Sequence, residues 1–197
     1  MNMIGRWLPF ALLACFAAFL AIIFKGPGGV TGKPEKSPGA VRLGALLQSV
    51  AYMFAWMFRR SWADPFRGAD LGPGLLIALA SLSAAVGAIA LAYKAKKHLG
   101  RQWALAARVI EGHDLVTDGP FGRVRHPLYL AMGLLLLSPV ICLSSWLGAS
   151  LAVFLFVIGT ALRVRAEESV LSEVFGGRYE DYRSRVPAFL PRLKQRR

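Results

Sequence analysis

Cysteine and histidine are scarce in this chain of 197 residues, which contains two cysteines and three histidines. Cys15 and Cys142 both lie inside apolar stretches and lack the close spacing of metal-binding cysteines. We predict that they are small packing residues, because a free cysteine in apolar surroundings behaves as a small hydrophobic side chain. The sequence therefore predicts neither a disulfide framework nor a metal site.

Acidic residues are also few, 11 against 24 lysines and arginines, so the net charge is +13. In a soluble protein this excess would suggest nucleic-acid binding, but the sequence contains no nucleic-acid-binding motif. Most of the basic residues lie between 25 and 42, between 94 and 125, and after 163. This clustering is typical of cytoplasmic loops that face anionic lipid. We expect membrane lipid as a partner, and no nucleic acid.

Apolar residues, in contrast, are abundant: 55% of the chain is hydrophobic and its mean hydropathy is +0.47. They form five blocks, at residues 7–24, 41–58, 75–93, 128–143 and 146–162. A membrane-spanning helix needs about 20 mostly apolar residues. The first three blocks are long enough on their own, and the last two are short. The sequence predicts an all-α integral membrane protein with about five transmembrane helices.

The last two blocks are separated only by Ser144 and Ser145, with no charge between them. We predict a tight helical hairpin here. One long tilted helix is the alternative, and Pro139 together with the serine pair argues against it. Arg6 precedes the first block, as in a signal peptide, but no small-residue cleavage site follows, so we expect this block to be retained. Five spans and the basic loops place the N-terminus outside and the C-terminus in the cytosol.

Polar residues are concentrated in the second half of the chain. Residues 1–93 hold three spans joined by glycine- and proline-rich loops, and we interpret this region as a membrane scaffold. Residues 94–197 hold a polar linker, the hairpin, a helix containing two adjacent glutamates, and a basic tail. Within the linker, Asp118-Gly119-Pro120 is a turn signal. We expect the functional groups in this second region.

Two charged clusters flank the predicted hairpin. At its start, Arg125 and His126 precede Pro127, which favours the first turn of a helix because its missing N–H costs little there. A helix N-terminus attracts anions, and these two side chains add positive charge, so the junction suits a carboxylate. After the hairpin, Glu167 and Glu168 suit an ammonium group. If the hairpin folds back, the two clusters meet at one membrane face.

An aromatic residue lies beside the first cluster. Tyr129 is about one turn inside the predicted helix, and aromatic faces attract cations such as a sulfonium centre. The clusters and the ring together fit S-adenosylmethionine, which has a zwitterionic methionine end and a sulfonium. The alternative is that the charged residues are interfacial groups that pair with one another, as is common at span ends. Residue spacing alone leaves both interpretations open.

Six short segments occur along the chain in one order: Gly100-Arg101-Gln102-Trp103, His113-Asp114-Leu115-Val116, Gly119-Pro120-Phe121, Val124-Arg125-His126-Pro127-Leu128-Tyr129, Arg163-Val164-Arg165-Ala166-Glu167-Glu168 and Phe175-Gly176-Gly177-Arg178-Tyr179. This set resembles the isoprenylcysteine carboxyl methyltransferase family, with its bacterial and archaeal relatives, and more distantly the phospholipid N-methyltransferases. The resemblance covers about residues 94–191, whereas the first 90 residues match only in the number of spans. It implies a multi-pass membrane methyltransferase without a Rossmann domain, located in a bacterial inner membrane.

The resemblance also implies site residues. Those that would bind the cofactor S-adenosyl-L-methionine are His113, Leu115, Val116, Gly119, Arg125, His126, Tyr129 and Glu168. Glu168 would bind the methionine end, and Gly119 would let the backbone approach the cofactor closely. Arg163 matches an arginine that faces the acceptor. Phe121 stands where the family often has tyrosine, so no hydroxyl role is assigned to it, and Ala131 stands where glycine is frequent.

The implied acceptor is a lipophilic small molecule with a carboxylate, of the prenylcysteine type. A carboxylate is ionised near pH 7, so an in-line methyl transfer needs positioning and exclusion of water rather than a strong base. Arg163 would orient this carboxylate through paired hydrogen bonds. An amine acceptor, as in phospholipid or small-amine N-methyltransferases, would use a base, for which Glu167 and His113 are candidates. We predict Arg163 and Glu167 as catalytic residues and no obligate protein partner.

Two further functions stay open. Membrane reductases that use NADPH, such as sterol reductases, share a similar Arg-His-Pro-x-Tyr segment, although their chains have more spans. A non-catalytic membrane protein that keeps the fold is the other alternative. The intact His113, Tyr129 and Glu168 argue against a loss of activity.

Overall fold

The computed structural model describes residues 3–25, 38–58, 71–100 and 114–190, and throughout these ranges the regular structure is helical. Five long helices make up the body of the molecule: α1 (Met3–Phe24), α2 (Pro38–Met57), α3 (Leu71–Leu99), α4 (Pro127–Cys142) and α5 (Trp146–Phe175). A short 3-10 helix, η2 (Gly119–Gly122), precedes α4, and a final helix, α6 (Gly177–Arg185), follows α5. The predicted all-α fold is confirmed.

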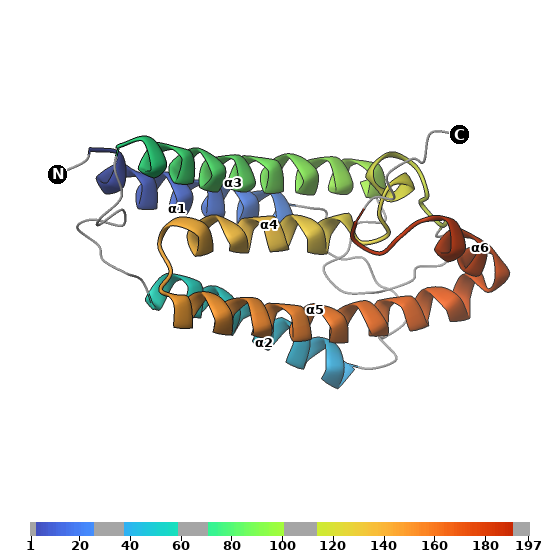
Figure 1. Cartoon of the computed structure of the whole chain (residues 1–197). Helices are drawn as coiled ribbons and strands as arrows, with labels where there is room; N and C mark the ends of the chain where they lie inside the picture. The colour runs from blue at the N-terminus through green and yellow to red at the C-terminus, as the bar shows by residue number, and fades with distance from the viewer. Residues whose placement is uncertain (1–2, 26–37, 59–70, 101–113, 191–197) are drawn as a thin grey trace, which may run out of the picture.

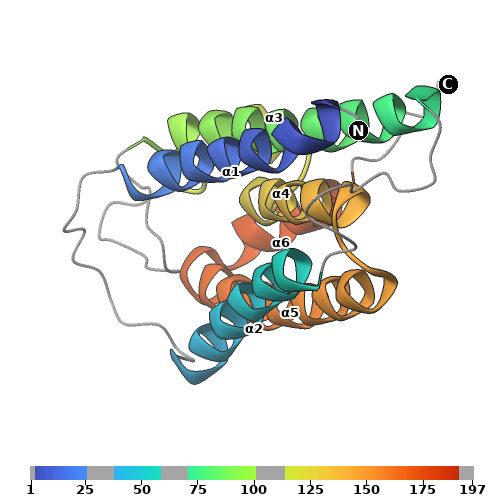
Figure 2. The same cartoon turned by 90° about the vertical axis from the view of Figure 1, so that its left-hand side faces the viewer.

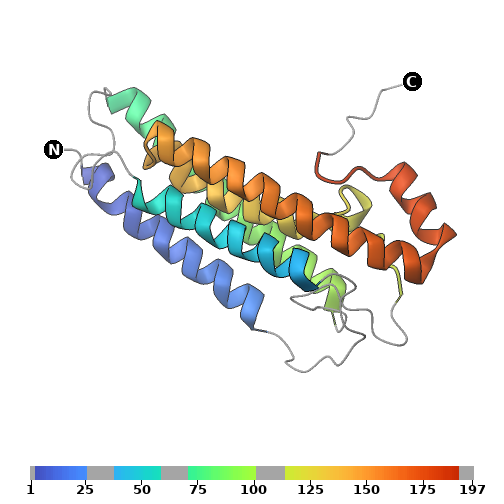
Figure 3. The same cartoon turned by 90° about the horizontal axis from the view of Figure 1, so that it is seen from below.

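Successive long helices run in opposite directions, so α1, α3 and α5 point one way and α2 and α4 the other (Figures 1 and 3). The last turn of α5, the first turn of α4 and α6 consequently lie at the same end of the bundle. In the view along the bundle, α4 lies between the α1–α3 pair and the α2–α5 pair (Figure 2). The most extensive helix contacts are those of α2 with α5 and of α3 with α4.

The outer faces of these helices carry large apolar side chains that are mostly exposed. Phe10, Leu76 and Phe154 are 62%, 69% and 62% exposed, respectively. Monomeric soluble proteins rarely expose apolar surface on this scale, whereas lipid tails accommodate it. The chain is therefore an integral membrane protein with several membrane-spanning helices, in agreement with the sequence.

Four of the helices, α1, α2, α3 and α5, are long and apolar enough to cross a membrane. The fifth predicted span is shorter: α4 has 16 residues, which corresponds to about 24 Å, against about 30 Å of hydrocarbon. Conversely, α5 has 30 residues and a length of about 45 Å. It runs without a break from the apolar block at 146–162 through Glu167 and Glu168. The last predicted span and the helix with the two glutamates are therefore one element.

The predicted hairpin between α4 and α5 is confirmed, and the long tilted helix is not formed. Ser145 is the N-cap of α5, where its side chain accepts a hydrogen bond of 3.2 Å from the backbone N–H of Gly148. The Ser144 hydroxyl donates to the carbonyl of Ala55 in α2, at 2.7 Å. Cys142 is buried beside this turn, as a packing residue. The serine pair therefore ends one helix, begins the next and fastens the turn to α2.

Candidate functional site

The site lies at the end of the bundle where α4 begins. His126 is the N-cap and Pro127 the first residue of α4, as the sequence predicts. The segment after α6 runs back across this junction: the backbone N–H of Arg125 donates to the carbonyl of Pro187 at 2.9 Å, and that of His126 donates to the carbonyl of Ala188 at 3.1 Å. These bonds fix the backbone of Arg125 and His126, the two residues of the positive cluster.

The two charged clusters meet at Glu168. Its Oε1 atom accepts hydrogen bonds from Arg125 Nε at 3.0 Å and from Arg125 Nη2 at 2.8 Å. The same oxygen lies 3.0 Å from His126 Nε2. The side chains of Arg125, His126 and Glu168 are only 11%, 2% and 14% exposed. The pairing of charges that the sequence left open as an alternative is therefore present in the fold.

The second carboxylate oxygen of Glu168 has a different environment. The half-exposed Arg183 faces this oxygen, but its Nε lies 3.9 Å from Oε2, which is beyond hydrogen-bond distance. Glu167 lies on the same side, with its Oε2 atom 3.9 Å from His126 Nδ1. Glu168 thus uses one oxygen to join α5 to α4, and its other oxygen can accept a further donor.

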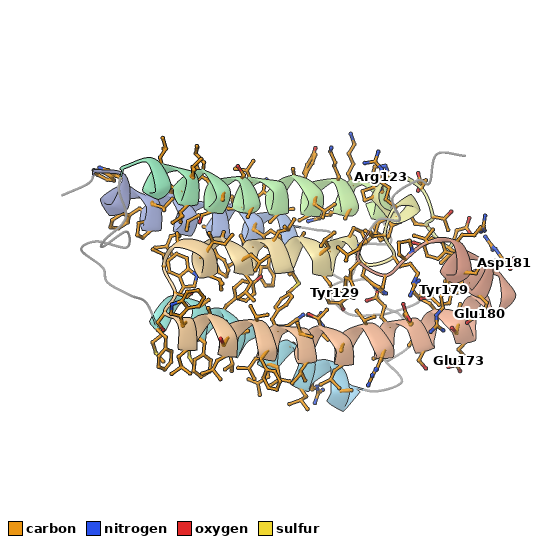
Figure 4. All side chains as sticks on the ribbon, in the orientation of Figure 1. Arg123, Tyr129, Glu173, Tyr179, Glu180 and Asp181 are labelled. Carbon is orange, nitrogen blue, oxygen red and sulfur yellow. The ribbon has the colours of Figure 1, made fainter. Side chains whose placement is uncertain are left out.

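Two buried polar atoms near this carboxylate have no hydrogen-bond partner within the described ranges. They are Nδ1 of His126 and the hydroxyl of Tyr179, whose side chain is 0% exposed. Burial, and after it the Glu168 carboxylate, raise the pKa of Tyr179 well above its usual range. Its phenol is therefore a neutral donor at pH 7. Figure 4 shows Tyr179 between α6 and the last turns of α5. Unpartnered buried polar groups of this kind are uncommon and are often functional.

An aromatic wall adjoins the cluster. The His126 ring lies close to those of Tyr129 and Phe189, with centroid distances of 5.9 Å and 5.8 Å. Tyr129 points from α4 towards α5 (Figure 4), and the guanidinium carbon of Arg163 lies 5.1 Å from the centre of its ring. Arg163 is thereby linked to the Glu168 cluster through Tyr129, in a cation–π geometry.

Arg163 is also bonded to α2. Its Nη1 atom donates to Oε1 of Gln48 at 2.7 Å, and Gln48 Nε2 donates to Oγ1 of Thr160 at 2.9 Å. Gln48 and Thr160 are 2% and 6% exposed. A buried amide with both ends bonded has a defined orientation. The region that the sequence presents as scaffold therefore supplies a polar contact to a predicted site residue.

The polar linker contacts α6 and α3. Asp114 pairs with Arg178 at 2.7 Å, and this bond holds the pKa of Asp114 below its usual range. Leu115 lines an open hollow of about 220 Å³ together with residues of α6 such as Tyr182. The Tyr182 hydroxyl donates to the carbonyl of Phe121 at 2.7 Å, and burial raises the pKa of Tyr182 to about 12.

The remaining predicted linker residues have diverse surroundings. Val116 is half-buried and follows Leu115. Gly119 has a φ of +56°, and a Cβ atom there would collide with the ring of His98 in α3. Its glycine is thus required by the backbone conformation and by His98. His113 lies outside the described residues. The fold therefore groups Arg125, His126, Tyr129, Arg163, Glu167 and Glu168, whereas the linker residues meet α6 and α3.

Sequence reasoning missed several residues that take part in this arrangement: Gln48, Thr160, Tyr179, Arg183 and Phe189. A signal existed for Gln48, because a polar residue in the middle of an apolar span is costly unless it has a partner. Tyr179 belongs to the last of the six segments that carry the family resemblance, but no site role was assigned to it. The other residues offered no signal, since serial position does not show that the segment after α6 returns to α4.

Comparison with known proteins finds a family match over just under half of the chain. A family model described as the isoprenylcysteine carboxyl methyltransferase (ICMT) family matches residues 79–173. This range contains α4, nearly all of α5 and the three residues Arg125, His126 and Glu168, and it excludes α2.

Three curated proteins are similar to part of the chain. A protein-S-isoprenylcysteine O-methyltransferase of Schizosaccharomyces pombe is 32% identical over 87 residues, which are 44% of this chain and 37% of that protein. The nickel-cobalt-cadmium resistance protein NccN of Alcaligenes xylosoxydans xylosoxydans is 35% identical over 103 residues, covering 48% and 45%. The cobalt-zinc-cadmium resistance protein CzcN of Cupriavidus metallidurans is 32% identical over 96 residues, covering 48% and 44%. The similarity thus spans less than half the length of each relative.

Proposed function

We propose that this chain is an S-adenosylmethionine-dependent membrane methyltransferase that acts on the carboxylate of a lipid-like acceptor, because residues 79–173 match the model of the isoprenylcysteine carboxyl methyltransferase family. The observation that carries this proposal is the convergence of Arg125, His126 and Glu168 beside Tyr129, inside the range that matches the family. S-adenosylmethionine supplies an electrophilic methyl group on a sulfonium.

The chain's own residues suit the methionine end of this cofactor. Glu168 keeps its Oε2 atom for an ammonium donor while Oε1 is held by Arg125 and His126. The neutral phenol of Tyr179 can donate to a carboxylate. Nδ1 of His126 is a second buried polar atom that has no hydrogen-bond partner within the described ranges. A zwitterion bound here would satisfy groups that the protein itself leaves unsatisfied, which favours binding.

Arg163 suits the acceptor. A guanidinium binds a carboxylate through two parallel hydrogen bonds and disfavours an ammonium nearby. Its position beside Tyr129 and between α2 and α5 supports a carboxylate acceptor with an apolar body over an amine. An ionised carboxylate needs no proton removed before it attacks. Arg163 and the helices around it therefore contribute orientation and exclusion of water, which speed an in-line displacement.

The location of the site supports a cofactor that arrives from the cytosol. With α5 about 45 Å long and the hydrocarbon layer about 30 Å thick, the Glu168 end of α5 extends towards one aqueous face. The lysines in the last turn of α3 and the arginines in the last turn of α6 lie at this end of the bundle (Figure 1), and basic residues favour the cytosolic side. We place the N-terminus outside and the C-terminus in the cytosol, in a bacterial inner membrane.

Isothermal titration calorimetry of the purified protein in detergent tests the cofactor. S-adenosylhomocysteine should bind and NADPH should not, and binding of NADPH alone would make the reductase alternative correct. Transfer of tritiated methyl groups to a prenylcysteine analogue and to lipid extracts then tests the acceptor. Arg163→Ala should impair turnover while S-adenosylhomocysteine affinity is retained. Methylation of an amine lipid with no labelling of the prenylcysteine would overturn the carboxylate assignment.

A further inference from the structure

We propose that Gln48 of α2 is a positioning residue that sets the orientation of the Arg163 guanidinium towards the methyl acceptor. This inference rests on the proposed function, because it assigns Arg163 to the acceptor. Gln48 lies outside the range that matches the family, and it is 2% exposed within an apolar span. A buried amide in such a place requires partners, and it has them at both ends.

The chemistry of the two partners decides which way the amide faces. A guanidinium can only donate hydrogen bonds, so Oε1 of Gln48 must face Arg163, at 2.7 Å from Nη1. The amide nitrogen then points to Thr160, whose Oγ1 atom accepts at 2.9 Å. Thr160 lies about one turn before Arg163 on the same helix. Gln48 therefore bridges two positions of α5 and keeps its carbonyl directed at the guanidinium.

The aliphatic part of the Arg163 side chain, which comes from α5, packs against the same face of α2. Gly44 lies one turn before Gln48, and a Cβ atom at position 44 would be 2.6 Å from Cγ of Arg163 and 2.6 Å from the carbonyl oxygen of Gly159. The missing side chain of Gly44 thus gives the arginine stem room to cross α2. With the stem against Gly44, the head bonded to Gln48 and one face towards Tyr129, the guanidinium has a defined orientation.

This arrangement has a functional consequence. If Arg163 binds the acceptor carboxylate, α2 determines how that arginine is presented, although the cofactor cluster is built from α4, α5 and α6. Loss of the Gln48 bond should weaken acceptor binding while cofactor binding stays intact. A residue that only maintained the fold would affect both.

The test uses Gln48→Met, which keeps the volume of the side chain but cannot hydrogen-bond, and Thr160→Val, which removes the acceptor for the amide nitrogen. The matched control is Ser49→Ala, at the exposed neighbouring position of α2. With N-acetyl-S-farnesylcysteine as acceptor, Gln48→Met should raise KM about tenfold and change kcat and the S-adenosylhomocysteine Kd less than about twofold. Thr160→Val should shift KM in the same direction, and Ser49→Ala should resemble the unmodified protein.

A second readout is independent of turnover. In protein labelled with ¹⁵N-arginine, a held guanidinium gives resolved, slowly exchanging Nη proton signals, and Gln48→Met should abolish those that disappear in Arg163→Ala. Unchanged Arg163 signals in Gln48→Met would overturn the inference, as would an unchanged acceptor KM in an active protein. Failure of S-adenosylhomocysteine to bind the unmodified protein would instead overturn the proposed function, while the NMR comparison would still decide whether Gln48 holds Arg163.

Discussion

Arg125 donates two hydrogen bonds to the same oxygen of Glu168, Oε1: one from Nε at 3.0 Å and one from Nη2 at 2.8 Å. The two residues are 43 positions apart in the sequence. The Nη1 atom of the same guanidinium donates to the carbonyl of Val186 at 2.6 Å. One side chain thus joins the start of α4, the far part of α5 and the segment after α6. The candidate cofactor site is organised around this contact.

Replacement of Arg125 by lysine should destabilise this end of the molecule. A lysine keeps the charge but has a single nitrogen, so it cannot bond to Glu168 through two nitrogens and to Val186 at once. We expect a loss of about 2 kcal/mol in the free energy of unfolding, from hydrogen bonds to charged groups. Thermal unfolding in detergent measures this effect, and an unchanged melting temperature would contradict the organising role of Arg125.

Glu168→Gln should weaken the binding of S-adenosylhomocysteine by about 10- to 100-fold, because a neutral amide loses the charge-assisted bond to an ammonium group. Glu173→Gln is the matched control, since Glu173 is an exposed glutamate further along α5 (Figure 4). Its affinity should stay within about twofold of the unmodified protein. Calorimetry compares the two, and equal affinities would remove Glu168 from the cofactor site.

Loss of the hydroxyl should have different effects at the two buried tyrosines of α6: lower stability for Tyr182 and weaker cofactor binding for Tyr179. Tyr182→Phe removes the bond to the Phe121 carbonyl and should cost about 1 kcal/mol of stability. Tyr179→Phe removes a hydroxyl that has no hydrogen-bond partner within the described ranges, so stability should change by less than about 0.5 kcal/mol. If the Tyr179 hydroxyl binds the methionine carboxylate, Tyr179→Phe should instead reduce S-adenosylhomocysteine affinity about tenfold. Chemical unfolding and calorimetry on both variants separate these effects.

Gly44→Ala should be destabilising, because the added methyl group would meet the carbonyl of Gly159 and the stem of Arg163 at 2.6 Å. We expect a cost of about 1–3 kcal/mol from this overpacking. Gly39→Ala, on the same helix, would meet nothing within 4 Å and should be neutral or should stabilise by up to about 1 kcal/mol. Thermal unfolding of the pair gives the result, and equal effects would show that α2 and α5 can separate without cost.

Local sequence signals predicted the helical elements well where a physical rule acts over a few residues. Pro127 begins α4 because proline favours a first helical position, and Ser144 and Ser145 lie at the turn between the two helices of the predicted hairpin. Gly176 ends α5 with a φ of +52°, a backbone conformation that favours glycine. The length of apolar runs likewise predicted a membrane protein, although α4 is shorter than a typical span and α5 is longer.

The candidate site was predictable only in part. The sequence led us to expect that the two charged clusters meet, and the fold brings Arg125, His126 and Glu168 together. The roles assigned to them, and the division into a scaffold and a catalytic region, stay predictions. Gln48 was not singled out, because its importance depends on the pairing of α2 with α5, which no local pattern encodes.

By itself, the sequence determined the class of this protein: apolar runs, basic loops and an ordered set of short segments indicate a helical membrane protein related to a methyltransferase family. These features depend on composition and short-range spacing, which a linear chain displays directly. The tertiary structure decided which helices are neighbours, and hence that Arg163 bonds to Gln48 and that Val186 to Ala188 cross the start of α4. Such contacts depend on how helices pack within the bundle, since residues distant in the chain meet only after the helices have associated through close packing and interhelical hydrogen bonds.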